Sequence, residues 1–254
     1  MSFDGFDDEL YWNEHQWEAH LDELEKKSEQ LRRFITTDPG SNEPRWITLL
    51  RENLDEGEAV DAFIEEELLL DEAYFPEEDD WDDEEDFDDE DLLFRDEDPL
   101  FFEDEEEDDF DEGEEWKFLS DQYAFSDYGS LENLPTYKTA RKLAVDTLKW
   151  AESIPRRHYN KVYHDFIGEV LKISAKIAGG FSFGYEQDYL GGNIAYNKKG
   201  LYCANHALHL LQMQRKAPYM IPAVYNKLHE RMFELRNEIG IHIQELRDRF
   251  NAGP

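Results

Sequence analysis

The sequence predicts an all-α protein, in which a C-terminal antiparallel four-helix bundle follows a largely disordered, strongly acidic N-terminal half with a few short helices. Two observations lead to this fold class: apolar residues recur at helical spacing in the C-terminal half, and charge is divided unevenly along the chain. Residues 1–133 contain 8 Lys and Arg against 52 Asp and Glu, whereas residues 134–254 contain 18 against 11. Such asymmetry is typical of a chain whose one half is an interaction tail or a solvating segment.

Composition and apolar spacing divide the chain into four parts. An acidic, partly helical segment covers residues 1–75, and a disordered acidic-aromatic tract covers residues 76–115. An aromatic lead-in segment follows at residues 116–135, and the four-helix bundle domain covers residues 136–252.

Three acidic helices are expected in the N-terminal segment, over residues 9–34, 45–53 and 58–75. The first has a narrow apolar stripe at spacings of seven, four, three and seven, made by Leu10, Trp17, Leu21, Leu24 and Leu31. The third has an apolar face made by Val60, Phe63, Ile64, Leu68 and Leu69. The sequence leaves open whether these helices fold alone, dock on the bundle or extend from an oligomer.

The acidic-aromatic tract combines very high charge with sparse aromatic rings. Residues 77–115 hold 27 acids and one base, Arg95, and repulsion at this density predicts disorder. Rings nevertheless recur through and just beyond the tract, at Trp81, Phe87, Phe94, Phe101, Phe102, Phe110 and Trp116. One interpretation is an acidic docking arm in which charge provides capture and rings provide anchoring. The other is a solvating spacer with incidental rings.

Beyond Pro135 the apolar spacing predicts four helices, over residues 136–153, 159–178, 186–214 and 222–250. The fourth keeps one register throughout, with Tyr225, Leu228, Met232, Leu235, Ile239, Ile243, Leu246 and Phe250 at alternating spacings of three and four. The dipeptide Gly179-Gly180 is expected to end the second helix. Gly191-Gly192 and Gly200, inside the third helix, are expected to permit close approach of another helix.

Three segments of this C-terminal half resemble a known family. They are YKTARKLAVDTLKWAESIP, the junction KISAKIAGGFSFGYEQDYLGGNIAYNKKGLYCANHALHLL, and the terminal helix ending in IHIQELRDRF. Together they are similar to the four-helix bundle proteins encoded within ribosomal RNA intervening sequences and to the related accessory variability determinant of diversity-generating retroelements. In the junction, Gly179 stands where the family usually has an acid. The resemblance implies a homo-oligomeric ring, pentameric in relatives, with a basic surface able to contact nucleic acid and no catalytic residue.

Basic residues form three clusters in the bundle segment: Arg156 and Arg157 with Lys161, Lys198 with Lys199, and Arg215 with Lys216. A structural interpretation is available for Arg215 and Lys216, because cations near a helix C-terminus are favoured by the helix dipole. The alternative is an anion-binding or nucleic-acid-binding surface, if the clusters are neighbours around one end of the bundle.

Candidate metal ligands are few. His206 and His209 lie three residues apart in the third bundle helix, which suits two imidazoles on one metal, but they lack a clear carboxylate partner and are interpreted as a polar edge. No Glu-x-x-His pair, nucleotide-binding loop or hydrolase motif is present in the sequence. We therefore expect no cofactor and no enzymatic activity. The alternative is a metal-dependent or small-molecule-binding enzyme that uses His206, His209, Glu238 and His242 in the bundle core.

The remaining sequence features concern location and the single cysteine. No apolar stretch approaches the roughly 18 to 20 residues needed to span a bilayer, and the N-terminus is acidic rather than basic. We expect a cytoplasmic protein of bacterial type with no membrane partner. Cys203 lies in a helical apolar pattern and is expected to be a small buried hydrophobic residue.

The leading functional hypothesis is a self-assembling interaction protein whose acidic arm mimics a polyanion. In this hypothesis the carboxylates of the tract meet bases such as Arg156, Arg157 and Lys161, while phenylalanine rings enter apolar grooves at the contact. The arm then regulates the binding of nucleic acid or of a basic protein. A simpler alternative is that the acidic arm only keeps the oligomer soluble.

Overall fold

A computed structural model describes residues 12–35, 43–72 and 129–252, and within these ranges it contains seven α-helices and no strand. The all-α class predicted from the sequence is therefore confirmed. The tract of residues 76–115 and all seven of its predicted ring anchors lie outside the described residues. The helices are α1 (Glu14–Ile35), α2 (Arg45–Glu52), α3 (Glu56–Glu72), α5 (Pro135–Glu152), α6 (Lys161–Ser182), α7 (Gln187–Met213) and α8 (Pro222–Ala252).

The helix starts follow local sequence signals. Asn160 caps α6, because its side-chain oxygen accepts a hydrogen bond from the backbone N–H of Tyr163 at 3.0 Å. Asp55 does the same for α3, where it accepts from Gly57 and Glu58 at 2.7 and 2.9 Å. These backbone donors lower the pKa of the Asp55 carboxyl.

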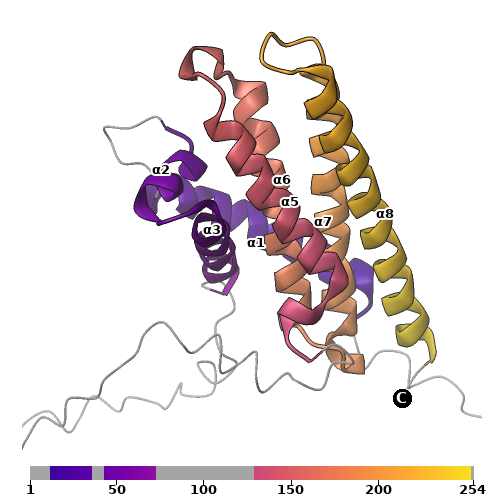
Figure 1. Cartoon of the computed structure of the whole chain (residues 1–254). Coiled ribbons are helices and arrows are strands. Elements are labelled where there is room, and N and C mark those ends of the chain that lie inside the picture. The colour runs from indigo at the N-terminus through magenta and orange to yellow at the C-terminus, as the bar shows by residue number, and fades with distance from the viewer. Residues whose placement is uncertain (1–11, 36–42, 73–128, 253–254) are drawn as a thin grey trace, which may run out of the picture.

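The four C-terminal helices α5 to α8 pack together, and we call them the bundle. Each helix contacts the next in the chain, and α5 also contacts α8. Consecutive helices run in opposite directions, so the α5–α6 and α7–α8 connections lie at the same end of the bundle (Figure 1). The largest side chains buried in the bundle include Tyr163, Phe166, Leu143, Leu148, Ile167, Leu171, Ile173, Ile177, Leu190 and Ile194.

The expectation that Gly179-Gly180 ends the second bundle helix is wrong, because α6 continues to Ser182. The two glycines serve helix packing instead: a Cβ atom on Gly179 would lie 2.9 Å from the Tyr196 ring, and one on Gly180 would lie 2.6 Å from Asn197 Nδ2. The helix ends just before Gly184, whose φ of +83° is readily adopted only by glycine.

Helices α2 and α3 share the core of the bundle. Trp46 and Leu49 of α2, and Val60, Phe63 and Ile64 of α3, are buried in the same apolar cluster as the bundle side chains. Helix α3 contacts α5 and α6, and Arg141 of α5 pairs with Asp61 of α3. The two helices are therefore docked on the bundle rather than separate from it.

Helix α1 lies differently, across the bundle and against α7 (Figure 1). Its buried residues Leu21 and Leu24 form a small cluster with Ala195 and Tyr196 of α7, and Trp17 and Phe183 pack against this cluster. This cluster is separate from the main core.

Candidate anion-binding surfaces

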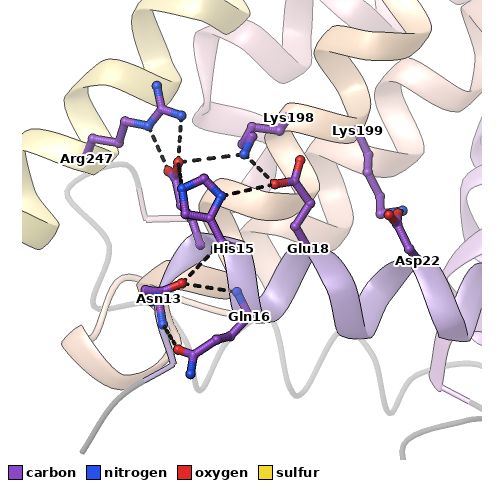
Figure 2. Close-up of polar contacts among 9 residues, drawn as sticks. Asn13, His15, Gln16, Glu18, Asp22, Lys198, Lys199 and Arg247 are labelled. Atoms are coloured by element: carbon purple, nitrogen blue, oxygen red, sulfur yellow. Dashed lines mark hydrogen bonds and ion pairs between the residues drawn. The ribbon is translucent and has the colours of Figure 1, made fainter. Parts of the chain in front are cut away.

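The start of α1 is fixed by a reciprocal capping arrangement. The Asn13 side-chain oxygen accepts from the backbone N–H groups of His15 and Gln16 at 3.0 and 3.1 Å, and Gln16 Oε1 accepts from the backbone N–H of Asn13 at 2.9 Å. These bonds satisfy N–H groups that a helix start leaves unpaired. Figure 2 shows these bonds among Asn13, His15 and Gln16. Glu14, the first acid of the helix, lies within this capped turn.

Four acids of α1 lie over four bases of the bundle. Beginning at α8, Glu14 accepts two hydrogen bonds of 2.8 Å from Arg247, and Glu18 accepts from Lys198 Nζ at 2.6 Å (Figure 2). Further along, Lys199 Nζ donates to Asp22 at 2.6 Å and to Glu25 at 2.7 Å, and Lys176 of α6 lies 3.9 Å from Glu25. Helix α1 therefore crosses from α8 over α7 towards α6 along a continuous row of ion pairs.

In this row of ion pairs, each acid stabilises the charged form of its basic partner, and each base stabilises the charged form of its acid. The hydrogen bonds from Arg247 lower the pKa of the Glu14 carboxyl, although partial burial acts in the opposite direction. Burial also acts to raise the pKa of Glu25, but the ammonium groups of Lys176 and Lys199 outweigh it and the pKa is lowered. The pKa of Lys199 is raised, because the carboxylates of Asp22 and Glu25 outweigh the effect of burial.

Beneath the acids, α1 rests on small and aromatic residues. Gly191 of α7 is essential to this contact, because a Cβ atom there would lie 2.5 Å from the carbonyl oxygen of Trp12 and 2.8 Å from the Trp17 ring. Trp17 packs edge-on against Phe183, with ring centroids 5.0 Å apart. The expectation that Gly191 permits close helix approach is thereby confirmed. We call the surface beneath α1 the α1 seat, composed of Phe183, Gly191, Ala195, Tyr196, Lys176, Lys198, Lys199 and Arg247.

The seat lies largely on a stretch of sequence without acids. Residues 189–229 contain no Asp or Glu, in a chain where 63 of 254 residues are acidic. The acids that neutralise Lys198 and Lys199 are therefore supplied by α1, more than 170 positions earlier. The two lysines are evident from the sequence as a basic cluster. The acid-free stretch around them is the signal in the sequence that acids from another part of the chain neutralise this region.

A second basic surface lies at the end of the bundle where the α5–α6 and α7–α8 connections meet. It is formed by Arg156, Arg157, Lys161, Arg215 and Lys216, and we call it the basic end. The two connections are in contact, since the His158 and Tyr219 rings lie 5.8 Å apart, and Gln214 at the end of α7 donates to the backbone oxygen of Val162, at the start of α6, at 3.4 Å.

A shallow pocket of about 410 Å³ opens between these connections, lined by Asn160, Lys161, Val162, Met213, Gln214, Ala217 and Tyr219. Arg156 lies 3.7 Å from Glu43, and Arg215 stacks over the Tyr225 ring at 5.4 Å. Within the part of the chain that the structure describes, Arg157, Lys161, Arg215 and Lys216 have no ion pair with an acid. Among the described residues, the basic end is therefore largely without acidic partners.

The structure therefore divides the predicted basic residues into two groups. Five of them come together at the basic end, as the hypothesis of neighbouring clusters required. Lys198 and Lys199 do not join them, because they lie in the middle of α7 beneath α1 (Figure 2).

The histidines considered as metal ligands lie in different surroundings. His206 lies 3.5 Å from Glu169 of α6, His209 is exposed, and His242 is buried 3.8 Å from Glu245. Burial lowers the pKa of His242. Across residues 12–35, 43–72 and 129–252, no group of three or more His, Cys, Asp or Glu side chains is placed to hold a metal ion.

Two further sequence expectations can be compared with the structure. Cys203 is buried, as expected, and burial raises the pKa of its thiol to about 12. Among the described helices, none has the length and apolar character needed to cross a bilayer.

Comparison with known proteins adds no relative. No family model, no curated protein and no solved structure matches this chain, so the resemblance to the intervening-sequence proteins remains a prediction from the sequence.

Proposed function

We propose that this chain is a non-enzymatic interaction protein that binds an anionic partner, nucleic acid foremost, through the basic surfaces of an antiparallel four-helix bundle. In this proposal the acidic N-terminal half is an internal polyanion mimic that competes for those surfaces. The observation that carries the proposal is the acid-free stretch of residues 189–229. Acids of α1 cover its bases at the seat, whereas no acid of the described residues pairs with its bases at the basic end.

Carboxylates on α1 already make the contacts that phosphates would make. Lysine and arginine bind carboxylate and phosphate oxygens with similar charge-assisted hydrogen bonds, so the two kinds of anion compete for the same donors. At the seat, an incoming polyanion has to displace Glu14, Glu18, Asp22 and Glu25. At the basic end the described residues provide only Glu43 as a competitor, which makes this end the first point of contact.

Self-assembly of the bundle is part of the proposal. Large apolar side chains are exposed on the outer surfaces of α7 and α8, including Tyr202 at 71% and Ile241 at 61% of their surface. Such residues support a contact between copies, as the family resemblance implies. Light scattering on the full chain at low and high salt tests it: an apolar contact persists at 1 M salt, whereas a monomer under both conditions contradicts it.

The basic end is tested by titrating the full chain with single-stranded RNA and DNA oligonucleotides at several salt concentrations. If all five bases contact phosphates, the logarithm of the affinity falls with the logarithm of salt with a slope of about −3.5, from about −0.7 per contact. The variant R156E/R157E/K161E/R215E/K216E is expected to bind at least tenfold more weakly and with a shallower slope.

The matched control reverses exposed bases elsewhere on the bundle, in K138E/K142E. It should leave most of the binding intact, because these lysines lie on α5 away from the basic end. An equal loss in the control would mean that net charge alone governs binding. No measurable binding at 50 mM salt would refute the proposal.

Internal mimicry is tested by comparing two further variants with the full-length chain. Removal of residues 77–115, and separately the substitution E14Q/E18Q/D22N/E25Q, should each increase the affinity for RNA, because each removes competing carboxylates. Unchanged affinity at low salt in both variants would contradict internal mimicry, while leaving binding at the basic end unaffected.

A further inference from the structure

We infer that the α1 seat is a docking surface for an acidic amphipathic helix, and that α1 of a second copy of this chain can occupy it by exchange. This inference is independent of nucleic-acid binding, because it concerns only α1 and the surface beneath it. It assigns to the seat a partner of defined chemistry.

The seat recognises a specific pattern on α1. Residues 14–25, EHQWEAHLDELE, place one tryptophan and two leucines towards the seat, and Glu14, Glu18, Asp22 and Glu25 towards its bases. Ring and leucine side chains meet Phe183 and the Ala195-Tyr196 pair, while the absent side chain at Gly191 leaves room for the helix start. An acidic helix with this spacing of apolar residues can pack on the apolar residues of the seat and pair with its bases at the same time.

The seat is preformed without α1. Its residues belong to α6, α7 and α8, apart from Phe183, which directly follows α6. These helices pack through the main core, whereas the apolar contacts of α1 form a separate cluster. Removal of α1 therefore leaves the helices that carry the seat in place, and a free seat remains able to accept another acidic helix.

The ion pairs between α1 and the seat can break and form again, which allows α1 to dissociate from the seat and rebind. Lys198 and Lys199 are largely covered, but the acids that they meet keep 36% to 58% of their side-chain surface exposed. Ion pairs with one solvent-exposed partner are individually modest and are screened by salt. Nine residues separate Ile35 from Arg45, and a fully extended segment of that length reaches up to about 30 Å, which allows α1 to extend to a neighbouring molecule.

Reciprocal exchange preserves every contact. When two copies each place α1 in the seat of the other, both seats remain filled, so the exchanged dimer differs from two monomers only in its connections and its association entropy. Docking within one chain has the advantage of a high effective concentration. Exchange is therefore favoured by high protein concentration and by conditions that loosen the ion pairs.

The sharpest experiment uses two full-length variants with opposite charge reversals. E14K/E18K/D22K makes α1 basic, and K198E/K199E/R247E makes the seat acidic. In a mixture, the basic helix of the first variant fits only the acidic seat of the second, and the acidic helix of the second fits only the basic seat of the first. Native mass spectrometry is expected to show a 1:1 complex that is absent from either variant alone.

Two controls accompany this mixture. Combining all six substitutions in one chain should restore docking within the chain and abolish complex formation, which also shows that the reversed surfaces fold. Mixing E14K/E18K/D22K with K138E/K142E/K227E, which reverses three exposed bases outside the seat, should give no additional complex. If the complementary pair forms no more complex than this control pair, the inference is wrong.

The wild-type chain provides a second test that does not depend on substitutions. Equal amounts of ¹⁴N- and ¹⁵N-labelled chain are incubated together and treated with a carbodiimide, which joins carboxylates to amines already in contact, such as Asp22 and Lys199 at 2.6 Å. Exchange gives cross-linked peptides of mixed isotope that increase with protein concentration. Exclusively unmixed pairs at millimolar concentration would show that α1 docks only on its own chain.

Discussion

The absence of a side chain at position 191 determines how closely α1 approaches α7. In the variant Gly191→Ala, the new Cβ atom would lie 2.5 Å from the backbone oxygen of Trp12, and a backbone atom has little freedom to move aside. We expect α1 to undock while the bundle remains folded. Hydrogen exchange measured by mass spectrometry should show loss of protection in residues 14–27 only.

Gly240 provides the matched control for this substitution. It lies inside α8, and a Cβ atom there meets nothing within 4 Å. Gly240→Ala should therefore stabilise the chain by up to about 1 kcal/mol through helix propensity alone, without any change at α1. If both substitutions leave α1 protected, the steric argument for Gly191 fails.

The thiol of Cys203 should be unreactive in the folded chain. Burial raises its pKa to about 12, so almost no thiolate exists at pH 8. Ellman's reagent at pH 8 is expected to react with Cys203 only at the rate at which the bundle opens, and rapidly in denaturant. Rapid reaction of the native chain would contradict this burial.

Single residues were only partly predictable from the sequence. Periodicity correctly placed the buried faces of the bundle helices, because a strict spacing of three and four leaves one choice of apolar face. The sequence shows Lys198 and Lys199 as a basic cluster of the third bundle helix, but it does not predict that they lie beneath α1, since their partners Glu18 and Asp22 lie far away in the chain. Pairings of this kind depend on tertiary packing, which local patterns do not record.

At the scale of an element, α1 should be released by acid. The pKa values of Glu14 and Glu25 are lower in the docked helix than the usual 4.5, so the docked state binds fewer protons. Docking is therefore fully stabilised above about pH 4.5 and is lost as the pH falls through the lowered values. The raised pKa of Lys199 affects docking only at high pH, because its ammonium group stabilises the docked helix until the pH rises through that raised pKa and the charge is lost.

The acid release is measured from the indole N–H signals in NMR spectra recorded between pH 3 and 6. The Trp17 signal should shift before that of Trp46, which is buried in the main core. In the variant E14Q/E25Q, the Trp17 signal should lose most of this pH dependence. If the two tryptophans shift together, acid unfolds the whole chain and α1 has no separate transition.

The elements themselves followed from the sequence more closely than their packing. Each expected helix is present with ends within a few residues, except that α6 runs through Gly179-Gly180. Glycine is disfavoured inside a helix by about 1 kcal/mol, so the sequence predicts that the pair ends the helix. Contacts with Tyr196 and Asn197 of α7 reverse that preference, and they are not visible from α6 alone.

For the whole molecule, the shared core predicts that α2 and α3 unfold together with the bundle. Their side chains Trp46, Val60 and Phe63 are buried in the same cluster as those of α5 and α6, whereas α1 belongs to a separate cluster. Hydrogen exchange should therefore show one slow cooperative unit comprising α2, α3 and α5 to α8. Helix α1 should exchange faster, and more so at 1 M salt.

A useful control for this prediction is the variant Trp46→Ala, which should weaken protection in α2, α3 and the bundle together by removing a shared buried ring. If α2 and α3 exchange faster than the bundle in the wild-type chain, they form a separate unit. The sequence left this organisation open, because acidic helices with a narrow apolar face are compatible with a free, a docked or an extended arrangement.

The row of ion pairs between α1 and the seat also limits which substitutions this chain can accept during evolution. A change at position 199 from lysine to an acid would be tolerated more readily in a lineage where position 22 has become basic, and the same holds for positions 18 and 198. Position 191 should accept only glycine as long as the helix start lies over it. In homologous sequences, substitutions in α1 are therefore expected to correlate with substitutions in the seat, although the two regions lie far apart in the gene.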